Sequence, residues 1–376
     1  MSDTIVERKG FGTRMKNSFS GVFGGIIILL IGIGILVFNE RNNVKNIHNI
    51  KELRDNYVDV DSSKVDKEYD GKLIVTSGKL DFGDVELTDS TFNVSVKTPL
   101  LVRTVEMYQW EEEKEDKDDE TVYSYKLVWS DEAIDSSSFK DSSSHTNPGS
   151  LPYEGKSESA QNLKVGEYKL SSSFTSLLSA EYKYTDLTNA TVPEGYTVKD
   201  GYIMKSADPE KPQVGDVRIS FSYASYSDVS VLGKLTGDTI AEYETKEGTK
   251  IKRFTDGVHD GNDIITSMEK GNKLLKWGLR LLGTILIMAG VASVFGPLKT
   301  LTSYVPILGG LVNGVTGLMA FLIGLAISLV VIAVSWIIFR PLLGIALLAG
   351  AILLIVLAVV FSSKKKKQEP VQPNQM

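Results

Sequence analysis

The chain has 376 residues, of which 47 are acidic, 41 are basic and none is cysteine. The absence of cysteine excludes disulfide frameworks, thiol catalysis and metal sites built on thiolates. Residues 39–272 hold 44 acidic and 28 basic residues, a net charge of −16, which excludes the basic surface that nucleic-acid binding requires.

A basic tail, residues 1–19, precedes the first apolar run of the chain. The run at 20–38 has no charge from Val22 to Phe38, and about 20 apolar residues suffice to cross a bilayer. The charged triplet Asn39-Glu40-Arg41 follows it without the small residues of a signal-peptide cleavage site. We therefore predict a retained transmembrane helix at 20–38.

Residues 39–272 form one long hydrophilic domain. Apolar residues recur at every third position from Val44 to Leu53, which predicts a helix that continues the first span. Beyond Gly71 the pattern becomes typical of strands. We expect a β-rich domain, with two strand-rich subdomains at about 71–130 and 160–256.

A β-hairpin is predicted near the middle of this domain. The segments LVRTVEMYQW (101–110) and TVYSYKLVW (121–129) pair across an almost wholly charged connection, 111–120. This connection lacks the glycine and ligand spacing of a calcium loop, so we interpret it as a solvated hairpin tip. Further along, VGDVRISFSYA (214–224) alternates apolar and polar residues and predicts another strand.

The last third of the chain is apolar and holds no Asp or Glu from residue 273 to residue 363. A carboxylate at the bilayer centre costs about 3 kcal/mol or more, so this block is typical of a membrane-embedded region. We predict transmembrane helices at 273–296, within 305–339 and at 341–362, followed by a basic tail, 363–376. The glycine-rich start of the middle segment, 305–315, is expected to lie at the interface or to re-enter the membrane.

Four crossings put both termini on one side of the membrane. Both tails are basic, so the positive-inside rule places them in the cytoplasm and the large domain outside it or in a lumen. A second group of basic residues opposes this orientation, because it lies at the membrane ends on the other side. Its members are Arg41, Lys45, Lys273, Lys276 and Arg280.

No motif for catalysis, cofactor binding or metal binding is found. The three histidines, His48, His145 and His259, have no ligand spacing, and no nucleotide-binding loop or nucleophile elbow is present. Proton-coupled transporters use intramembrane Asp, Glu or His, and the C-terminal apolar block has none. Arg280 and Arg340 are interpreted as snorkelling residues, the latter beside a helix break at Pro341.

Small residues recur at the four-residue spacing that lets membrane helices pack closely. The candidate packing residues are Gly21 with Gly25, Gly310 with Gly314, and Ala346 with Gly350. They predict contacts among the helices of one chain or between copies of it.

Several motifs together resemble the transmembrane protein 43 family, in family order over nearly the whole chain. They are VEMYQW (105–110), YSY (123–125), WS (129–130), HTNP (145–148), VGDVRISFSYA (214–224), WGLR (277–280) and RPL (340–342), with Phe139 between them. The motif positions of interest are Glu106, Tyr108, Trp110, His145, Asn147, Pro148, Gly215, Asp216, Arg280, Arg340 and Pro341.

The resemblance implies an α+β membrane protein with four transmembrane helices, one N-terminal and three C-terminal, around a large β-rich extracytoplasmic domain. It also implies OB-like β-barrel units, as in bacterial membrane-scaffold proteins of the NfeD type. No catalytic residue carries over from the family. The short N-terminal tail and the lack of cysteine favour a bacterial member.

We therefore expect a non-enzymatic, self-associating scaffold for membrane organisation, whose partners are the lipid bilayer, other copies of the chain and other membrane proteins. Its location is the bacterial cytoplasmic membrane, or the endoplasmic reticulum and inner nuclear membrane in a eukaryote. Two alternatives stay open: a channel or transporter accessory subunit, and an ectodomain hydrolase that uses His145 and nearby serines.

Overall fold

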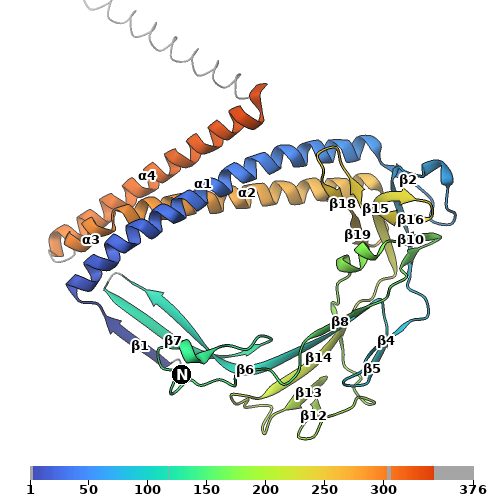
Figure 1. Ribbon diagram of the computed structural model, residues 1–376, viewed down its shortest axis with the longest axis horizontal. Coiled ribbons are helices and arrows are strands. Elements are labelled where there is room, and N and C mark those ends of the chain that lie inside the picture. Colours follow the sequence, from blue (N-terminus) through green and yellow to red (C-terminus); the bar gives the residue numbers. More distant parts are fainter. Residues whose placement is uncertain (1–2, 118, 303–305, 343–376) are drawn as a thin grey trace, which may run out of the picture. The chain divides into compact units, whose positions relative to one another are not determined.

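The computed structural model describes residues 3–117, 119–302 and 306–342, with only the backbone described for 302 and 306–313 (Figure 1). The chain divides into two compact units. The β unit comprises Met1–Gly10 and Asn49–Glu269, and the membrane unit comprises Phe11–His48 and the chain from Lys270 onward.

Among the described residues, four helices supply the membrane unit. They are α1 (Phe11–Asn56), α2 (Gly261–Val294), α3 (Gly296–Thr302) and α4 (Pro306–Phe339). Three stretches of the described residues are long and apolar enough to cross a membrane: Phe11–Asn56, Gly261–Val294 and Gly314–Phe339. The predicted fourth span, 341–362, lies almost wholly outside the described residues. The segment expected at the interface forms the first turns of α4 from Pro306 onward.

Helices α1 and α2 run antiparallel within the membrane unit. The Asn39 side chain donates to the carbonyl of Lys276 near one end (3.1 Å). Near the other end Gly25 of α1 lies against Gly290 of α2, and the Ser18 hydroxyl is hydrogen-bonded to Thr300 on α3. The buried core between the helices is small and apolar, with Leu36, Ile287, Val291 and Ala320 at its centre. Large apolar side chains cover the outer faces of α1, α2 and α4, as lipid contact requires.

The first sheet of the β unit closes into a five-stranded barrel. Its ring runs β3 (Leu73–Asp81), β9 (Lys164–Val165), β10 (Tyr168–Leu170), β16 (Thr239–Ala241) and β15 (Asp228–Thr236), which pairs back with β3. Only β10 and β16 are parallel neighbours within this ring. Strands β2 (Val58–Asp59) and β19 (Arg253–Asp256) extend the barrel sheet, and β17 (Tyr243–Glu244) pairs with β18 (Lys250–Ile251).

The second sheet has eight strands, with β6 and β14 at its centre. The main order is β1 (Asp3–Arg8), β7 (Glu120–Ser130), β6 (Leu100–Asp116), β14 (Val217–Tyr223), β13 (Tyr202–Lys205) and β12 (Thr197–Lys199). Strand β11 (Tyr182–Tyr184) pairs with β14, and β8 (Lys156–Ser159) pairs with β6. The hairpin of β4 (Glu86–Asp89) and β5 (Val94–Lys97) stands apart, and the short helices are η1 (Lys67–Tyr69), η2 (Ser136–Ser138) and η3 (Ser172–Leu177).

The predicted alternation in 214–224 is confirmed, because Val217, Ile219 and Phe221 are all buried in one core cluster. The strand-rich ranges at 71–130 and 160–256 each contribute strands to both sheets. The ends of α1 and α2 that belong to the β unit pack on the barrel sheet. Ile50, Leu53, Ile264 and Ile265 join Leu232 and its neighbours in one cluster.

The predicted hairpin of β6 and β7 is confirmed, with Trp110 opposite Leu127 (Figure 1). The strand is longer than expected, because the acidic run from Glu111 to Asp116 continues β6. Pairing with β7 brings one cation opposite these acids, Lys126, whose Nζ lies 3.1 Å from Glu111 Oε2. The turn is thereby confined to the residues between Asp116 and Glu120.

Strand β1 belongs to the N-terminal tail, yet it pairs with β7 in six registered positions, such as Thr4 with Ser124. Lys140 and Glu7 form an ion pair, and Lys9 Nζ lies 3.1 Å from Asp116 Oδ1. Paired strands lie about 4.8 Å apart, whereas a bilayer core is about 30 Å thick. This pairing therefore disagrees with a tail and a β unit on opposite sides of the membrane. The pairing of β1 with β7 is explained by the outer edge of β7, because an edge strand accepts an extended segment as a neighbour.

Candidate functional site: a buried charged cluster between membrane helices

Three helices bring Glu40, Arg280 and Trp336 together in the membrane unit. Glu40 follows the apolar run of α1 and is only 1% exposed. Its Oε1 accepts from Arg280 Nε on α2 at 2.6 Å, and its Oε2 accepts from Trp336 Nε1 on α4 at 2.9 Å. Each carboxylate oxygen thus contacts a different helix, so this one side chain ties α1, α2 and α4 together.

Aromatic and basic side chains surround this ion pair. The Arg280 guanidinium lies 4.8 Å from the ring centre of Trp277 and 5.7 Å from that of Trp336, distances suited to cation–π attraction. Lys276 Nζ lies 5.7 Å from the Trp277 ring. The Arg340 Nη2 is buried and has no hydrogen-bond partner among the described residues.

Glycines at seven-residue spacing let α1 and α2 approach closely enough to bury this cluster. A Cβ placed on Gly290 would lie 2.6 Å from the Gly25 carbonyl oxygen, and one on Gly32 would lie 2.8 Å from the Gly283 carbonyl oxygen. Both distances are far inside van der Waals contact, so only glycine fits. On α4, a Cβ on Gly324 would lie 2.8 Å from the Met288 Cα.

The geometry makes Glu40 a fixed structural anion, since both of its oxygens already accept hydrogen bonds. Buried ion pairs are tolerated in a medium of low dielectric constant only when such partners are present. The cluster as a whole is not neutral, because Glu40 pairs with Arg280 alone, whereas Lys276 and Arg340 add two further positive charges. It can therefore hold the helices in register and attract an anion.

The β-unit motif residues meet along the edge of β6 that β14 leaves unpaired. Past Met107, β14 no longer pairs with β6, and two loops take its place. Tyr108 donates its N–H to the Asp216 carbonyl (2.8 Å) and accepts from the Gly215 N–H (2.9 Å). Gly215 adopts a φ of 91°, which favours glycine. Asp216 in turn accepts from Ser206 Oγ and the Gln213 N–H.

Asn147 covers the next step of the same edge. Its Oδ1 accepts from the Trp110 N–H at 2.7 Å, and its Nδ2 donates to the Trp110 carbonyl at 2.8 Å. One side-chain amide thus replaces a missing strand, since it satisfies both backbone groups of Trp110. Pro148 follows directly and lies beside Gly215.

His145 is enclosed by aromatic rings. It stacks on Tyr125 with ring centres 3.7 Å apart and meets the edge of Trp110 at 4.6 Å. Its Nδ1 lies 3.1 Å from the Asp141 carbonyl oxygen, and the residue is 2% exposed. Glu106, the remaining motif residue of this sheet, forms a two-point ion pair with Arg218 on β14 (2.6 and 2.8 Å).

Comparison with known proteins identifies a family for the chain. The family model described as Transmembrane protein 43 matches residues 107–341, more than half of the chain. The chain belongs to the transmembrane protein 43 family. The membrane cluster residues Arg280, Trp336 and Arg340 lie inside the matched range, and Glu40 lies outside it.

The family's curated members span almost the same length. The chain is 28% identical to Transmembrane protein 43 of Homo sapiens over 365 residues, which cover 92% of this chain and 90% of that protein. It is 30% identical to the Transmembrane protein 43 homolog of Drosophila melanogaster over 351 residues, covering 87% and 91%. The Mus musculus protein is 28% identical over 359 residues, covering 90% and 89%. No solved structure matches the chain.

The packing residues predicted for this family member lie in different places. Gly25 is buried against α2, whereas a Cβ on Gly21 or Gly314 would meet open space among the described residues. Gly310 lies where only the backbone is described, and Ala346 and Gly350 lie outside the described residues. Of the arginines interpreted as snorkelling, Arg280 instead forms the buried ion pair. Pro341 follows Arg340 just past the end of α4.

Sequence reasoning missed Asn39, Glu40 and Trp336. Glu40 stands two residues past the apolar run, where an acid is ordinarily solvated. The sequence contained an indication of this site, because an acid, Glu40, and an arginine, Arg280, stand at the ends of two successive apolar spans. Neutralising such charges by pairing is the usual arrangement at membrane depth.

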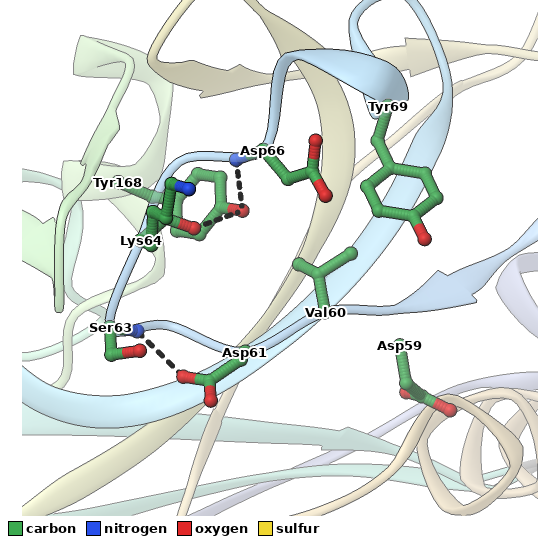
Figure 2. A pocket seen from close by; sticks show the side chains of 8 residues that line it. All are labelled: Asp59, Val60, Asp61, Ser63, Lys64, Asp66, Tyr69 and Tyr168. Carbon is green, nitrogen blue, oxygen red and sulfur yellow. Dashed lines mark hydrogen bonds between the residues drawn. The ribbon is translucent and has the colours of Figure 1, made fainter.

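A cavity of about 380 Å³ in the β unit presents three aspartates, Asp59, Asp61 and Asp66 (Figure 2). Their carboxylates hold the local backbone. Asp61 accepts from the Ser63 N–H at 2.7 Å, which lowers the pKa of Asp61, and Asp59 accepts from the Gly261 N–H at 2.8 Å. Tyr168 donates to the Lys64 carbonyl across the cavity. Among the described residues, no group of three or more His, Cys, Asp or Glu side chains is placed to hold a metal ion.

Proposed function

We propose that the chain is a non-enzymatic multi-pass membrane protein that acts as a self-associating scaffold for membrane organisation or for complexes of membrane proteins. The observation that carries the proposal is the presence of two kinds of glycine in the membrane unit. Gly25, Gly32, Gly283 and Gly290 are used within the chain, whereas others face open space among the described residues. These outward glycines include Gly21 and Gly24 on α1 and Gly314 and Gly317 on α4.

Small outward residues favour contact between copies, because membrane helices associate by close backbone approach rather than by the hydrophobic effect. The internal cluster around Glu40 supplies a rigid frame for such contacts. In this proposal α4 provides the surface for self-association, and the β unit provides a surface for membrane-protein partners.

The test is cross-linking in intact native membranes followed by mass spectrometry. Links between copies are expected for the wild type and should fall at least about threefold when Gly314 and Gly317 are both changed to Leu. Val315→Leu is the matched control, since Val315 is already large and exposed. If the cross-links in the wild type join only residues within one copy of the chain, the proposal is wrong.

A channel or transporter accessory role is a second candidate, favoured by one observation. Ionisable residues between membrane helices often mark ion paths, and Glu40 is such a residue. Ion flux through liposomes of the purified chain, altered by Glu40→Gln, would support this role. The contacts of Glu40 favour the scaffold, because both of its oxygens are held by side chains.

The hydrolase alternative depended on His145. The stacking on Tyr125 and the contact with Asp141 give this histidine a structural role, which supports the non-enzymatic proposal. An unchanged phenotype with His145→Ala in a folded protein would remove the candidate. Loss of the phenotype with normal folding would restore it.

We also infer that the barrel is OB-like. Numbered along the chain, its five strands occur in the ring order first, second, third, fifth, fourth, with the third and fifth parallel. This Greek-key arrangement is that of the small OB barrels. We place the β unit on the extracytoplasmic or lumenal side, on the basis of the charges of the two tails. The pairing of β1 with β7 opposes this placement, and the labelling experiment in the Discussion decides between the two.

A further inference from the structure

Positive charge exceeds negative charge in the cluster around Glu40. Arg280, Lys276 and Arg340 supply three cations. Lys276 and Arg280 both lie near the Trp277 ring, and the backbone N–H of Arg340 donates to the carbonyl of Trp336, whose ring contacts Glu40. Glu40 is the single carboxylate in contact with this group among the described residues. Because residues 273–363 contain no acid, the C-terminal block has no second carboxylate to offer.

Arg340 has a hydrogen-bond donor without an acceptor. Its Nη2 is buried and unpartnered among the described residues, and a buried unpaired donor costs free energy. Glu40 does not serve it, since its oxygens accept from Arg280 and Trp336, and Arg340 Nη2 makes no bond to either of them. The cluster thus has both a surplus positive charge and a donor that needs an anionic oxygen.

The position of the cluster along the helices indicates where that oxygen comes from. Asn39 and Glu40 follow the apolar run of α1, Lys276 stands where the apolar part of α2 begins, and Arg340 follows the end of α4. Trp277 is 61% exposed beside them. Tryptophan and basic residues at the ends of apolar spans mark the membrane–water interface, which is the depth of lipid headgroups.

We propose that this cluster binds the phosphate of an anionic phospholipid headgroup. Arginine presents a planar fork of donors that matches phosphate oxygens, whereas lysine acts as a point charge. Arg340 is the principal donor, Lys276 adds charge, and Trp277 packs beside the headgroup. Glu40 orients Arg280 and limits the surplus charge. Basic pockets between transmembrane helices bind anionic headgroups in this way.

The test uses the purified full chain in nanodiscs and native mass spectrometry. The probe lipids are phosphatidylglycerol and phosphatidylcholine in equal amounts, and the readout is the ratio of the two lipids that the protein retains. The wild type should prefer phosphatidylglycerol. Arg340→Gln should reduce that preference about tenfold, as expected for one lost charge-assisted contact, and Arg340→Lys should reduce it less. Lys16→Gln, which removes a cation from the far end of α1, is the matched control.

Glu40→Gln separates lipid binding from a purely structural role. Removal of the negative charge should leave the preference for phosphatidylglycerol unchanged or increase it, even if the helices become less stable. An equal preference in the wild type and in Arg340→Gln would overturn the proposal. Displacement of the lipid by millimolar inorganic phosphate would also overturn it, because the ligand would then be free phosphate.

Discussion

Glu40 and Arg280 are 240 residues apart in the sequence, yet Arg280 Nε lies 2.6 Å from Glu40 Oε1. The two residues stand on α1 and α2, and all strands of the β unit except β1 lie between these helices along the chain. Their side chains are 1% and 12% exposed, so solvent screens the pair little. The ion pair therefore joins the helix that enters the β unit to the helix that leaves it.

Glu40→Ala should destabilise the chain by about 3–5 kcal/mol, because it leaves Arg280 buried without its partner. The double change Glu40→Gln with Arg280→Gln should cost less than the sum of the two single changes. Thermal unfolding of the purified chain in detergent measures both effects. The control is Arg41→Ala, at an exposed neighbouring position. Equal stability of Glu40→Ala and the control would show that the pair does not hold the helices.

Gly290→Ala should destabilise the membrane unit by about 1–3 kcal/mol. Its new methyl group would meet the Gly25 carbonyl oxygen at 2.6 Å and the Leu29 nitrogen at 2.8 Å, and backbone atoms cannot move aside cheaply. Gly278→Ala on the same helix is the matched control, since its methyl would meet nothing within 4 Å. Alanine has the higher helix propensity, so the control should be neutral or stabilised by up to about 1 kcal/mol. The same unfolding assay compares the two variants.

The sequence predicts those elements whose pattern is local. Alternation predicts β14, with Val217, Ile219 and Phe221 in the core, and the repeat of apolar residues after Val44 predicts that α1 continues past the membrane span. The acidic run after Trp110 is misleading, because a run of charged residues is typical of loops, whereas here its backbone pairs with β7 and continues strand β6.

The site depends on contacts that a local pattern does not contain. Glu40 is buried only because Arg280 and Trp336 reach it from two other helices. The four-residue glycine motif finds Gly25, but it misses Gly32, Gly283 and Gly290. These glycines recur at seven residues, the repeat by which one face of a helix follows a neighbouring helix over several turns.

Asn147→Ala should destabilise the β unit by about 1–3 kcal/mol, because the Trp110 N–H and carbonyl would both lose their partner. Asn147→Asp should also destabilise it, since the carboxylate accepts from the N–H but cannot donate to the carbonyl. Tryptophan fluorescence during thermal unfolding reports on the change. Asn162→Ala, at an exposed position, is the control and should leave the transition within about 0.5 kcal/mol of the wild type. No difference between Asn147→Ala and this control would contradict the role of Asn147.

Alkaline pH should weaken the β unit through Tyr125. Burial of the phenol and its hydrogen bond to Glu112 raise the pKa of Tyr125 to about 12, against about 10 in an unfolded chain. Between these values the unfolded state loses the proton while the folded state keeps it. The stabilisation is therefore complete below about pH 10 and is lost as the pH rises to about 12.

The loss should reach about 2 kcal/mol, and Tyr125→Phe should lack this component of the pH dependence. Urea unfolding at pH 9 and at pH 11.5 provides the measurement. Tyr182→Phe is the control, because Tyr182 is 52% exposed. Parallel pH profiles for Tyr125→Phe and the wild type would exclude Tyr125 as the source.

The pairing of β1 with β7 predicts a disulfide between Thr4→Cys and Ser124→Cys, which stand opposite each other in the register. The chain has no cysteine of its own, so the engineered pair has no competitor. Mild oxidation of native membranes, followed by a gel-mobility assay on protease-nicked chain, measures the bond. Thr4→Cys with Ser157→Cys is the control, since Ser157 pairs with Val102 on another strand.

The two single-cysteine variants, each tested alone, show whether the tail and the β unit lie on the same side of the membrane. A membrane-impermeant maleimide should label Thr4→Cys and Ser124→Cys from the same side if β1 forms the edge of the sheet. Labelling from opposite sides, with no disulfide in the double variant, would instead support the topology expected from the basic tails. The outer edge of β7 would then be free to pair with an extended segment of another protein, because an uncovered edge strand offers unpaired N–H and C=O groups.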